Sequence, residues 1–514
     1  MTRPGSFDYV VVGGGSAGCV LAARLSEDPD THVLLLEAGS GTPLDLVAVP
    51  PAWPALMGTE ADWADRTVPQ DGADGLVVPW PRGRGLGGSS TINAMCFLRG
   101  HVSSYDAWVK QGATGWAYDD LLPYFKRSEN VTGVPGRDPR YRGMDGPLRV
   151  APAANRHPLA EAFLAAAVEA GHPVTEDFTS GLDTAFGWGD LSIADGRRWD
   201  AATAYLRGPV MDRPNLHVVT DTLVHRLTFE GERCTGVVHG ADGDLIEVRA
   251  EREVVLTAGA VGSAQLLMLS GIGPASHLRE LGITTRADLP GVGANLQDHP
   301  MCGVVYEATG PVPPAANGHG EVQGLIRTDD SLDGPDVQLQ MVDVPLREDT
   351  LPGPGFDRGY TIMVALMTPC SRGSIRLSEA TPGSAPIIDP RYYADSRDVD
   401  AVVHGVRAAR RIGAATALDA WRGAEAQPGL AALSDEELRA YVRRNLRSYG
   451  HYTGTCRIGA ADDVDAVVRT DLRVRGVAGL RVADASVMPS VVSANTNATV
   501  YAIAERAADL LRGH

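Results

Sequence analysis

The sequence predicts an α/β protein, α+β overall, with two domains, one begun by a βαβ unit and one built on an antiparallel sheet. The first observation is a glycine motif between an apolar strand and a helix, in FDYVVVGGGSAGCVLAARL. The second is polar–apolar alternation in DVQLQMV (336–342) and GSIRLS (373–378). The third is the length, because 514 residues are too many for one hydrophobic core.

The amino-terminal βαβ unit has the pattern of a Rossmann-like dinucleotide site. A short strand, 9–12, is followed at once by Gly13-x-Gly15-x-x-Gly18, a helix and a second strand that ends in Glu37. Glycines let the backbone approach a pyrophosphate at the helix N-terminus, and Glu37 is placed for a ribose hydroxyl. The acid disfavours NADP but leaves FAD and NAD open. An ordinary glycine turn explains the sequence less well, because the strand, the glycine spacing, the helix and the acidic residue all fit a dinucleotide site.

A second glycine segment favours a flavin. In PWPRGRGLGGSSTINAM, Gly85, Gly87 and Gly88 precede Ser89 and Ser90, which gives a loop of N–H and hydroxyl donors. A NAD domain has no need of such a loop so soon after its first βαβ unit. The alternative is a flexible surface loop.

Several motifs in order resemble the glucose–methanol–choline (GMC) oxidoreductases, a flavin family. They are GRGLGGSSTINAM, LTAGAVGSAQLLMLSGIGP (256–274), GVGANLQDHP (291–300), GHYTGTCRIG (450–459) and the stretch 480–511. The resemblance runs from Phe7 to Leu511. It is nearest to the aryl-alcohol and hydroxymethylfurfural oxidases and the choline-dehydrogenase-like members.

The resemblance implies FAD and a set of residues that contact it. That set is Gly13, Gly15, Ser16, Ala17 and Gly18 at the pyrophosphate, Glu37 and Ala38 at the ribose, Val224 at adenine, Gly88, Asn93, Ala94 and Met95 along the phosphates and isoalloxazine, and Asp484, Ala485 and Thr496 near the ribityl side and the ring. Some members link FAD to a histidine of the first signature. Ile92 occupies that position here, so non-covalent FAD is expected.

His451, in RSYGHYTGTCRIG, is the expected catalytic base. No Cys or His is spaced to share a metal with it, and histidine suits proton removal because its ordinary pKa lies near neutrality. The resemblance implies that Asn495 completes the pair and orients the substrate oxygen. Asn495 could also cap the helix that follows. His299 is expected to be structural.

The implied reaction is oxidation of a primary alcohol to an aldehyde, with the hydride passing to flavin N5 and the proton to His451. Tyr449 and Gly450 are expected to line the substrate pocket, and Gly450 leaves room for a bulky or aromatic alcohol larger than methanol or choline. Reoxidation by O2, by a quinone or by a soluble carrier stays open, so oxidase and dehydrogenase both fit. The alternatives are a hydroxynitrile-lyase-like enzyme and a catalytically silent flavin-binding protein.

The expected domains are discontinuous. The FAD-binding domain takes 1–150, 200–298 and 451–514, and the substrate domain takes 151–199 and 299–450, with helices on one face of its sheet by resemblance. Segment 215–240 is expected to form hairpin-like strands. The Pro- and Gly-rich stretches 311–320 and 351–358 are expected to be loops, either a lid or ordinary surface loops.

The amino-acid composition argues against some classes of binding partner. A net charge of −18 argues against nucleic acid and anionic membranes, which attract basic patches. No signal peptide or membrane segment is expected. Six scattered cysteines without a zinc or CxxC spacing fit a reducing cytoplasm. No feature of the sequence indicates an oligomeric state.

Overall fold

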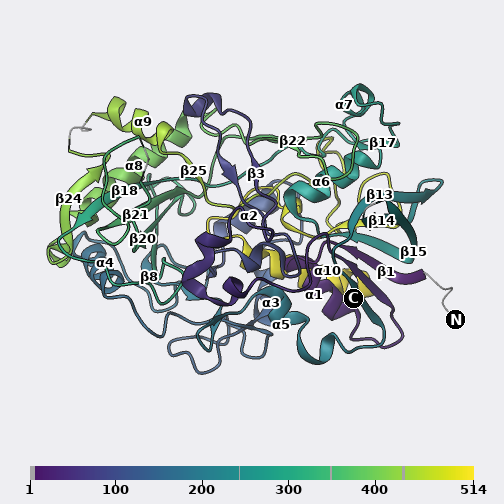
Figure 1. Cartoon of the computed structure of the whole chain (residues 1–514), viewed down its shortest axis with the longest axis horizontal. Helices are drawn as coiled ribbons and strands as arrows, with labels where there is room; N and C mark the ends of the chain where they lie inside the picture. Colours follow the sequence, from purple (N-terminus) through teal and green to yellow (C-terminus); the bar gives the residue numbers. More distant parts are fainter. Residues whose placement is uncertain (1–5, 242, 348–349, 431–433, 514) are drawn as a thin grey trace.

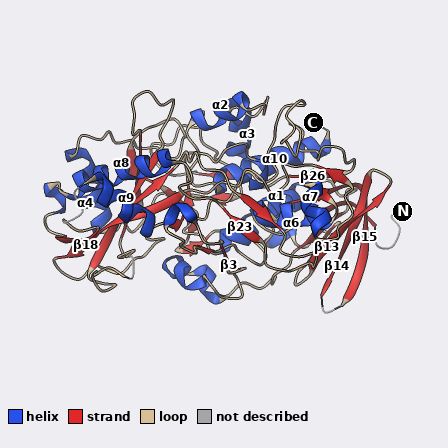
Figure 2. Ribbon diagram, turned by 90° about the horizontal axis from the view of Figure 1, so that it is seen from above, coloured by secondary structure: helices blue, strands red, loops and turns tan. Residues whose placement is uncertain are grey.

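The computed structural model describes residues 6–241, 243–347, 350–430 and 434–513, and two large sheets organise it (Figures 1 and 2). The helices are α1 (Ser16–Leu25), α2 (Val102–Lys110), α3 (Tyr118–Ser128), α4 (Pro158–Glu169), α5 (Ala201–Tyr205), α6 (Gly259–Leu269), α7 (Ala275–Glu280), α8 (Ser396–Gly413), α9 (Asp435–Arg444) and α10 (Asn497–Arg512). In Figure 2 one group of strands lies beside α4, α8 and α9, and the other lies near both chain termini.

The first sheet contains the predicted βαβ unit. Its order is β12-β2-β1-β15-β14-β13, with β26 also paired to β15. The strands are β1 (Ser6–Val12), β2 (Val33–Leu36), β12 (Leu216–Val219), β13 (Leu223–Glu230), β14 (Arg233–Ala241), β15 (Asp244–Leu256) and β26 (Leu480–Val482). β12, β2, β1, β15 and β26 pair in parallel, whereas β13, β14 and β15 pair antiparallel. The predicted hairpin is therefore β13–β14, but β12 runs parallel to β2 and lies outside it.

The second sheet is antiparallel, as the alternation predicted. Its order is β24-β18-β21-β20-β19-β8, with β25 paired to β18. The strands are β8 (Phe186–Trp188), β18 (Pro300–Ala308), β19 (Val322–Ile326), β20 (Val337–Val342), β21 (Gly359–Leu366), β24 (Arg422–Gln427) and β25 (Arg447–Ser448). α8 packs on β18, β20 and β21. A Cβ on Gly405 of α8 would lie 2.4 Å from Val364, so this helix needs a glycine to approach the sheet.

The other strands are short. They are β3 (Asp65–Arg66), β4 (Pro79–Trp80), β5 (Cys96–Phe97), β6 (Glu129–Asn130), β7 (Leu148–Arg149), β9 (Asp190–Leu191), β10 (Ile193–Ala194), β11 (Arg197–Arg198), β16 (Ile272–Gly273), β17 (Ala287–Asp288), β22 (Ser374–Arg376) and β23 (Ile387–Asp389). The GSIRLS stretch forms β22, which pairs only with β23, so its alternation reflects a separate two-stranded ribbon rather than the second sheet.

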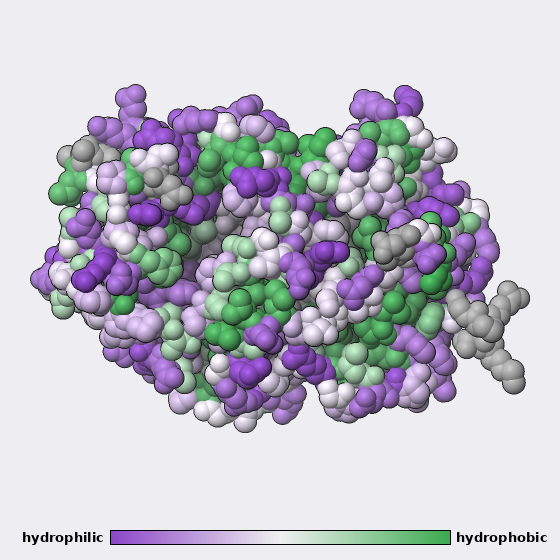
Figure 3. Space-filling model, in the orientation of Figure 1, coloured by the Kyte–Doolittle hydropathy of each residue, from purple (hydrophilic) through white to green (hydrophobic). Residues whose placement is uncertain are grey.

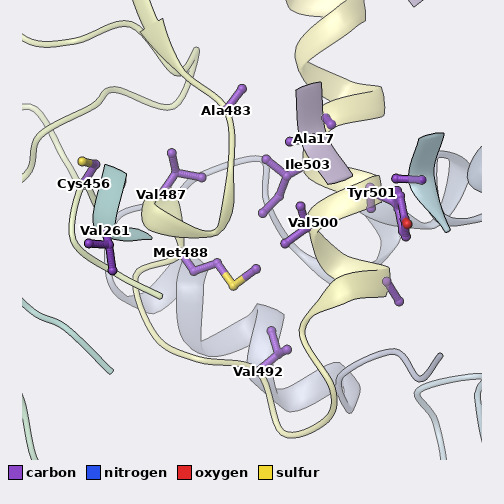
Figure 4. Close-up of a cluster of buried hydrophobic side chains, with 14 of the residues drawn as sticks. Ala17, Val261, Cys456, Ala483, Val487, Met488, Val492, Val500, Tyr501 and Ile503 are labelled. Atoms are coloured by element: carbon purple, nitrogen blue, oxygen red, sulfur yellow. The ribbon is translucent and has the colours of Figure 1, made fainter. Parts of the chain in front are cut away.

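The apolar core of the first sheet continues into the carboxyl-terminal helix. α10 packs against both α1 and α3, and Figure 4 shows Val500 and Ile503 of α10 next to Ala17 of α1. Figure 3 shows hydrophilic residues over much of one face of the molecule, as expected for a chain with 64 acidic and 46 basic residues. This packing places the start of α10 close to the glycine turn after β1.

Replacing Gly18 with alanine tests the close packing of α1 on the glycine turn. A Cβ on Gly18 would lie 1.9 Å from the Gly13 carbonyl oxygen, whereas a Cβ on Gly15 would lie 3.8 Å from its nearest neighbour. We expect Gly18→Ala to cost about 2 kcal/mol and Gly15→Ala about half as much or less. Thermal unfolding of the cofactor-free variants measures this, and equal melting temperatures would contradict it.

Candidate active site

A cavity of about 1000 Å³ lies between the two sheets. Its lining includes residues of the glycine turn after β1 and, from the second sheet, Gln340 and Met363. Every predicted site residue except one lines it, namely Gly13, Gly15, Ser16, Ala17, Glu37, Ala38, Gly88, Asn93, Ala94, Met95, Val224, Tyr449, Gly450, His451, Asp484, Ala485, Asn495 and Thr496. One cavity thus joins the predicted cofactor residues to the predicted catalytic pair.

Gly18 is the exception, because it does not line the cavity, and its contact with the cofactor stays a prediction. It is buried in α1, where a Cβ would meet both the Gly13 carbonyl oxygen at 1.9 Å and Thr257 Oγ1 at 3.0 Å. Thr257 Oγ1 donates to the same carbonyl at 2.7 Å. Gly18 therefore allows α1 to approach the strand closely and does not reach the cavity.

The two glycine segments touch and leave a surface without side chains. Gly13 and Gly88 have φ of +103° and +54°, values that favour glycine. A Cβ on Gly88 would lie 2.6 Å from the Cα of Gly15, and the Gly87 N–H donates to the Gly14 carbonyl at 2.8 Å. Such a surface beside the N-terminus of α1 suits a pyrophosphate.

Glu37 joins these two segments. Its carboxylate accepts hydrogen bonds from the N–H groups of Gly14 at 2.7 Å, Gly39 at 2.8 Å and Gly85 at 3.0 Å. Burial raises its pKa, and the three N–H donors oppose that shift. A carboxylate accepts about four hydrogen bonds, so capacity for one ribose hydroxyl remains.

The segment predicted to run along the isoalloxazine is held by Arg198, which sequence reasoning missed. Its guanidinium donates to Asn93 O at 2.7 Å and Asn93 Oδ1 at 2.8 Å, and to Val47 O at 2.9 Å. Asn93 Oδ1 also accepts from the Met95 N–H at 3.0 Å. Met95 has φ of +62°, an uncommon conformation for a non-glycine residue, and these contacts sustain it.

The predicted contacts near the ribityl side have clear structural partners. Asp484 accepts from Gly259 N, Ser263 Oγ, Ser486 N and Ser486 Oγ at 2.6 to 2.8 Å. Burial raises its pKa, and these four donors oppose the shift. Thr496 is the N-cap residue of α10, and both residues line the cavity. Asn495 precedes the cap, so the expectation that Asn495 caps this helix is wrong.

The predicted catalytic pair is assembled. Asn495 Nδ2 lies 3.3 Å from His451 Nε2, and His299 Nδ1 lies 2.8 Å from His451 Nδ1. Because an amide nitrogen only donates, His451 Nε2 accepts, and its proton sits on Nδ1 and points to His299. His451 therefore presents the lone pair of Nε2 beside Asn495.

Both imidazoles are neutral in this environment. Burial and then the nearby His299 lower the pKa of His451 well below its usual value. Burial lowers the pKa of His299 to about 3. A neutral His451 is ready to accept a proton without first losing one.

The backbone of His451 is anchored by a buried carboxylate. Asp298 Oδ1 accepts the His451 N–H at 2.7 Å, and Asp298 Oδ2 accepts the hydroxyls of Ser448, at 2.6 Å, and Tyr392. Burial raises the pKa of Asp298 to about 6, and these donors counter part of that shift. Residues 297 and 453 exchange backbone hydrogen bonds, so the two segments lie antiparallel.

His299 is the second functional residue that sequence reasoning missed. It was expected to be structural, yet it contacts the expected base directly, and among the described residues its Nε2 has no hydrogen-bond partner. It stands 152 residues from His451 in the chain. In the sequence, the only indication of this role was that His299 lies in QDHP, within a segment that resembles the GMC family.

The predicted substrate residues lie beside His451. The Tyr449 ring lies 4.3 Å from the His451 ring between centroids, and its hydroxyl donates to Gln340 Oε1 at 3.0 Å. Gly450 is exposed, with φ of +82°, and a Cβ there would meet no atom within 4 Å. A side chain at position 450 would therefore meet no neighbour, and room for a bulky substrate beside His451 stays a prediction.

The cavity fits FAD. The bare glycine surface and Glu37 offer donors and acceptors to the cavity, and the start of α10 offers N–H groups, which stabilise negative charge. Asn495 Oδ1 is buried and unpaired among the described residues, so a ligand hydroxyl can reach an acceptor there. Within the described ranges no group of three metal-ligating side chains occurs, and no helix there is long and apolar enough to cross a membrane.

Comparison with known proteins agrees with this geometry. Sequence profiles described as GMC oxidoreductase match residues 7–301 and 369–504. The mitochondrial choline dehydrogenase of Mus musculus is 42% identical over 99% of this chain and 90% of its own length. The oxygen-dependent choline dehydrogenase of Brucella anthropi is 39% identical over 98% and 95%.

Among solved structures, pyridoxine 4-oxidase from Mesorbium loti superposes with a TM-score of 0.95 and 39% identity, covering 99% of both chains. The similarity thus extends over the whole chain in sequence and in fold. This chain belongs to the GMC oxidoreductase family, which binds FAD and acts on CH–OH donors.

Proposed function

We propose that this enzyme oxidises a primary alcohol, bulky or aromatic, to an aldehyde, with His451 as the base. The observation that carries the proposal is the hydrogen-bond order His299, His451, Asn495, which turns the lone pair of Nε2 of a neutral imidazole toward Asn495 in the cavity lining, where a substrate hydroxyl would take the place of the Asn495 N–H. His451 accepts the hydroxyl proton there, and Asn495 holds the substrate oxygen. His299 is a positioning residue, because it fixes the tautomer of His451.

FAD supplies the hydride acceptor, at N5, when it is bound. The residues proposed to hold it are the lining residues named above, within a unit made of 1–150, 200–298 and 451–514. Residues 151–199 and 299–450 would form the substrate unit, in keeping with the second sheet. Ile92 lines the cavity and offers no nucleophile, which supports non-covalent binding.

A bulky alcohol is supported by the shape of the substrate end. Met301, Val342, Val344 and Met363 give it apolar walls, and Gly450 leaves one side open. Choline and pyridoxine, which the relatives' names mention, both carry a primary hydroxyl. The acceptor that reoxidises the flavin is proposed to be O2, a quinone or a soluble carrier. A cytoplasmic location is proposed because all six cysteines are free thiols.

Anaerobic titration of the FAD-loaded protein with alcohols tests the proposed activity. We expect aromatic primary alcohols to bleach the flavin absorbance, and methanol and ethanol to do so far less efficiently, because they leave the large cavity unfilled. Recovery of the colour in air would identify an oxidase, and recovery only with a quinone or carrier a dehydrogenase. Bound flavin that no alcohol bleaches, together with carbon–carbon cleavage of a cyanohydrin, would contradict the proposal and indicate a lyase.

His451→Gln tests the base. The rate of flavin reduction should fall by about 10²- to 10⁴-fold, as for loss of a general base, with flavin content preserved. Because its depressed pKa keeps His451 neutral, the wild-type rate should stay level from about pH 8 to pH 6 and fall only in more acid solution. Stopped-flow reduction across pH measures both. A loss smaller than tenfold, or an acid limb centred above pH 6.5, would argue against this assignment.

A further inference from the structure

His319 is fixed between a carboxyl group and a backbone carbonyl oxygen. Its Nδ1 lies 2.6 Å from Asp343 Oδ1, and its Nε2 lies 3.0 Å from the Pro51 carbonyl oxygen. A neutral imidazole has one N–H and satisfies only one of these acceptors. The shared proton resides on the ring rather than the carboxyl, because imidazole is the stronger base. The geometry therefore assigns an imidazolium at this position.

The groups around His319 agree with a positive charge. Burial alone would lower its pKa, but the hydrogen bond and charge of Asp343 raise it above its ordinary value. His157 Nε2 lies 3.9 Å from Asp343 Oδ2 and donates to the Pro313 carbonyl at 3.0 Å. Glu321 adds a further acidic group in the same wall, and burial raises its pKa. The neighbours of the His319 imidazolium are therefore the carboxyl groups of Asp343 and Glu321 and the neutral imidazole of His157.

The ion pair presents its positive end to the cavity. The His319 ring lines the cavity, next to the Trp53 ring, while the Asp343 side chain lies behind it and is 3% exposed. The loop that carries His319 is a packed wall rather than a lid. A Cβ on Gly318 would lie 2.4 Å from the Ala94 carbonyl oxygen, and one on Gly320 would lie 1.9 Å from the Gln340 amide.

Other charged groups that line the cavity do not offset this charge. The described carboxylates in the lining are Glu37, Asp65 and Asp484. The first and last bind protein N–H and hydroxyl donors, and Asp65 pairs with Arg82. The cations of Arg444 and Arg447 also line the cavity, in the segment that leads to Tyr449. Among the described residues, the lining at the substrate end therefore holds more basic than acidic side chains.

We propose that His319 is a specificity-determining residue whose fixed positive charge makes the site reject cationic alcohols and accept neutral or anionic ones. The inference rests on the proposed alcohol oxidation. It predicts that a quaternary ammonium alcohol is a poor substrate, although the cavity is large enough for it. In a partly desolvated cavity, repulsion between the His319 imidazolium and a cationic substrate costs more binding free energy than the fit of the substrate's shape gains.

Three substituted benzyl alcohols separate charge from size: 4-tert-butyl, its isosteric cation 4-trimethylammonio, and the 4-carboxylate anion. We expect wild-type kcat/KM for the neutral alcohol to exceed that for the cation by about tenfold or more, with the anion not disfavoured. In His319→Gln this ratio should fall to about threefold or less. His157→Gln is the matched control, because His157 is neutral in the same wall: its Nδ1 accepts from the Leu159 N–H. In His157→Gln, the ratio of kcat/KM for the neutral alcohol to kcat/KM for the cation should match the wild-type ratio.

Two measurements do not depend on turnover. Nitrogen-15 spectra across pH, with His319 assigned by its loss in His319→Gln, should show both ring nitrogens still protonated at pH 6.5, the ordinary pKa of histidine, and losing a proton only above it. Binding of the same three alcohols to the FAD-loaded His451→Gln variant, in which flavin reduction is slow, followed through the flavin spectrum, should show the same charge preference. Binding selectivity without oxidation would refute the proposed activity and leave this inference standing. A His319 that is neutral at pH 6.5, an unchanged ratio in His319→Gln, or a wild-type preference for the cation would overturn it, and the wild-type results decide if the variant fails to fold.

Discussion

The cofactor site depends on the hydrogen bonds of one buried carboxylate. Glu37 follows β2 and accepts N–H groups from the glycine turn after β1 and from the second glycine segment, 48 residues further along the chain. Without those bonds three buried N–H groups would lose their partner, which is costly. Because the two segments then touch at Gly15 and Gly88, the surface between them carries no side chain. Glu37 therefore assembles the cradle through protein hydrogen bonds alone.

The buried carboxylate of Asp298 organises the catalytic residues, as Glu37 organises the cofactor site. Asp298 holds the backbone of His451, and the next residue, His299, holds its ring. The pair Asp298-His299 therefore sets both the position and the tautomer of the base from one short segment. Burial keeps both imidazoles neutral, so His451 can accept the hydroxyl proton of the substrate without first losing a proton of its own. Asn495 completes the line from the loop before α10, whose N-terminus faces the same cavity.

Local patterns predicted the parts of the fold that depend on local physics. The strand, glycine turn and helix at the amino terminus, the antiparallel strand 337–342 and the cavity residues all follow from periodicity, glycine spacing or ordered motifs. Contacts between distant segments have no such signal. His299, Arg198 and His319 act through partners 105 to 268 residues away, so their roles emerged only from the fold. Gly18 lies outside the cavity lining because this position of the motif packs α1 against the glycine turn.

The central claim is that a C–H bond of an alcohol breaks in this cavity while Nε2 of His451 takes the hydroxyl proton. The most direct test is rapid anaerobic mixing of the FAD-loaded enzyme with 4-methoxybenzyl alcohol and its α,α-dideuterated form. The account predicts flavin bleaching with both alcohols, slower by several-fold for the deuterated one. Equal rates of bleaching would mean that C–H cleavage does not limit reduction, and an absence of bleaching with bound FAD would contradict the account.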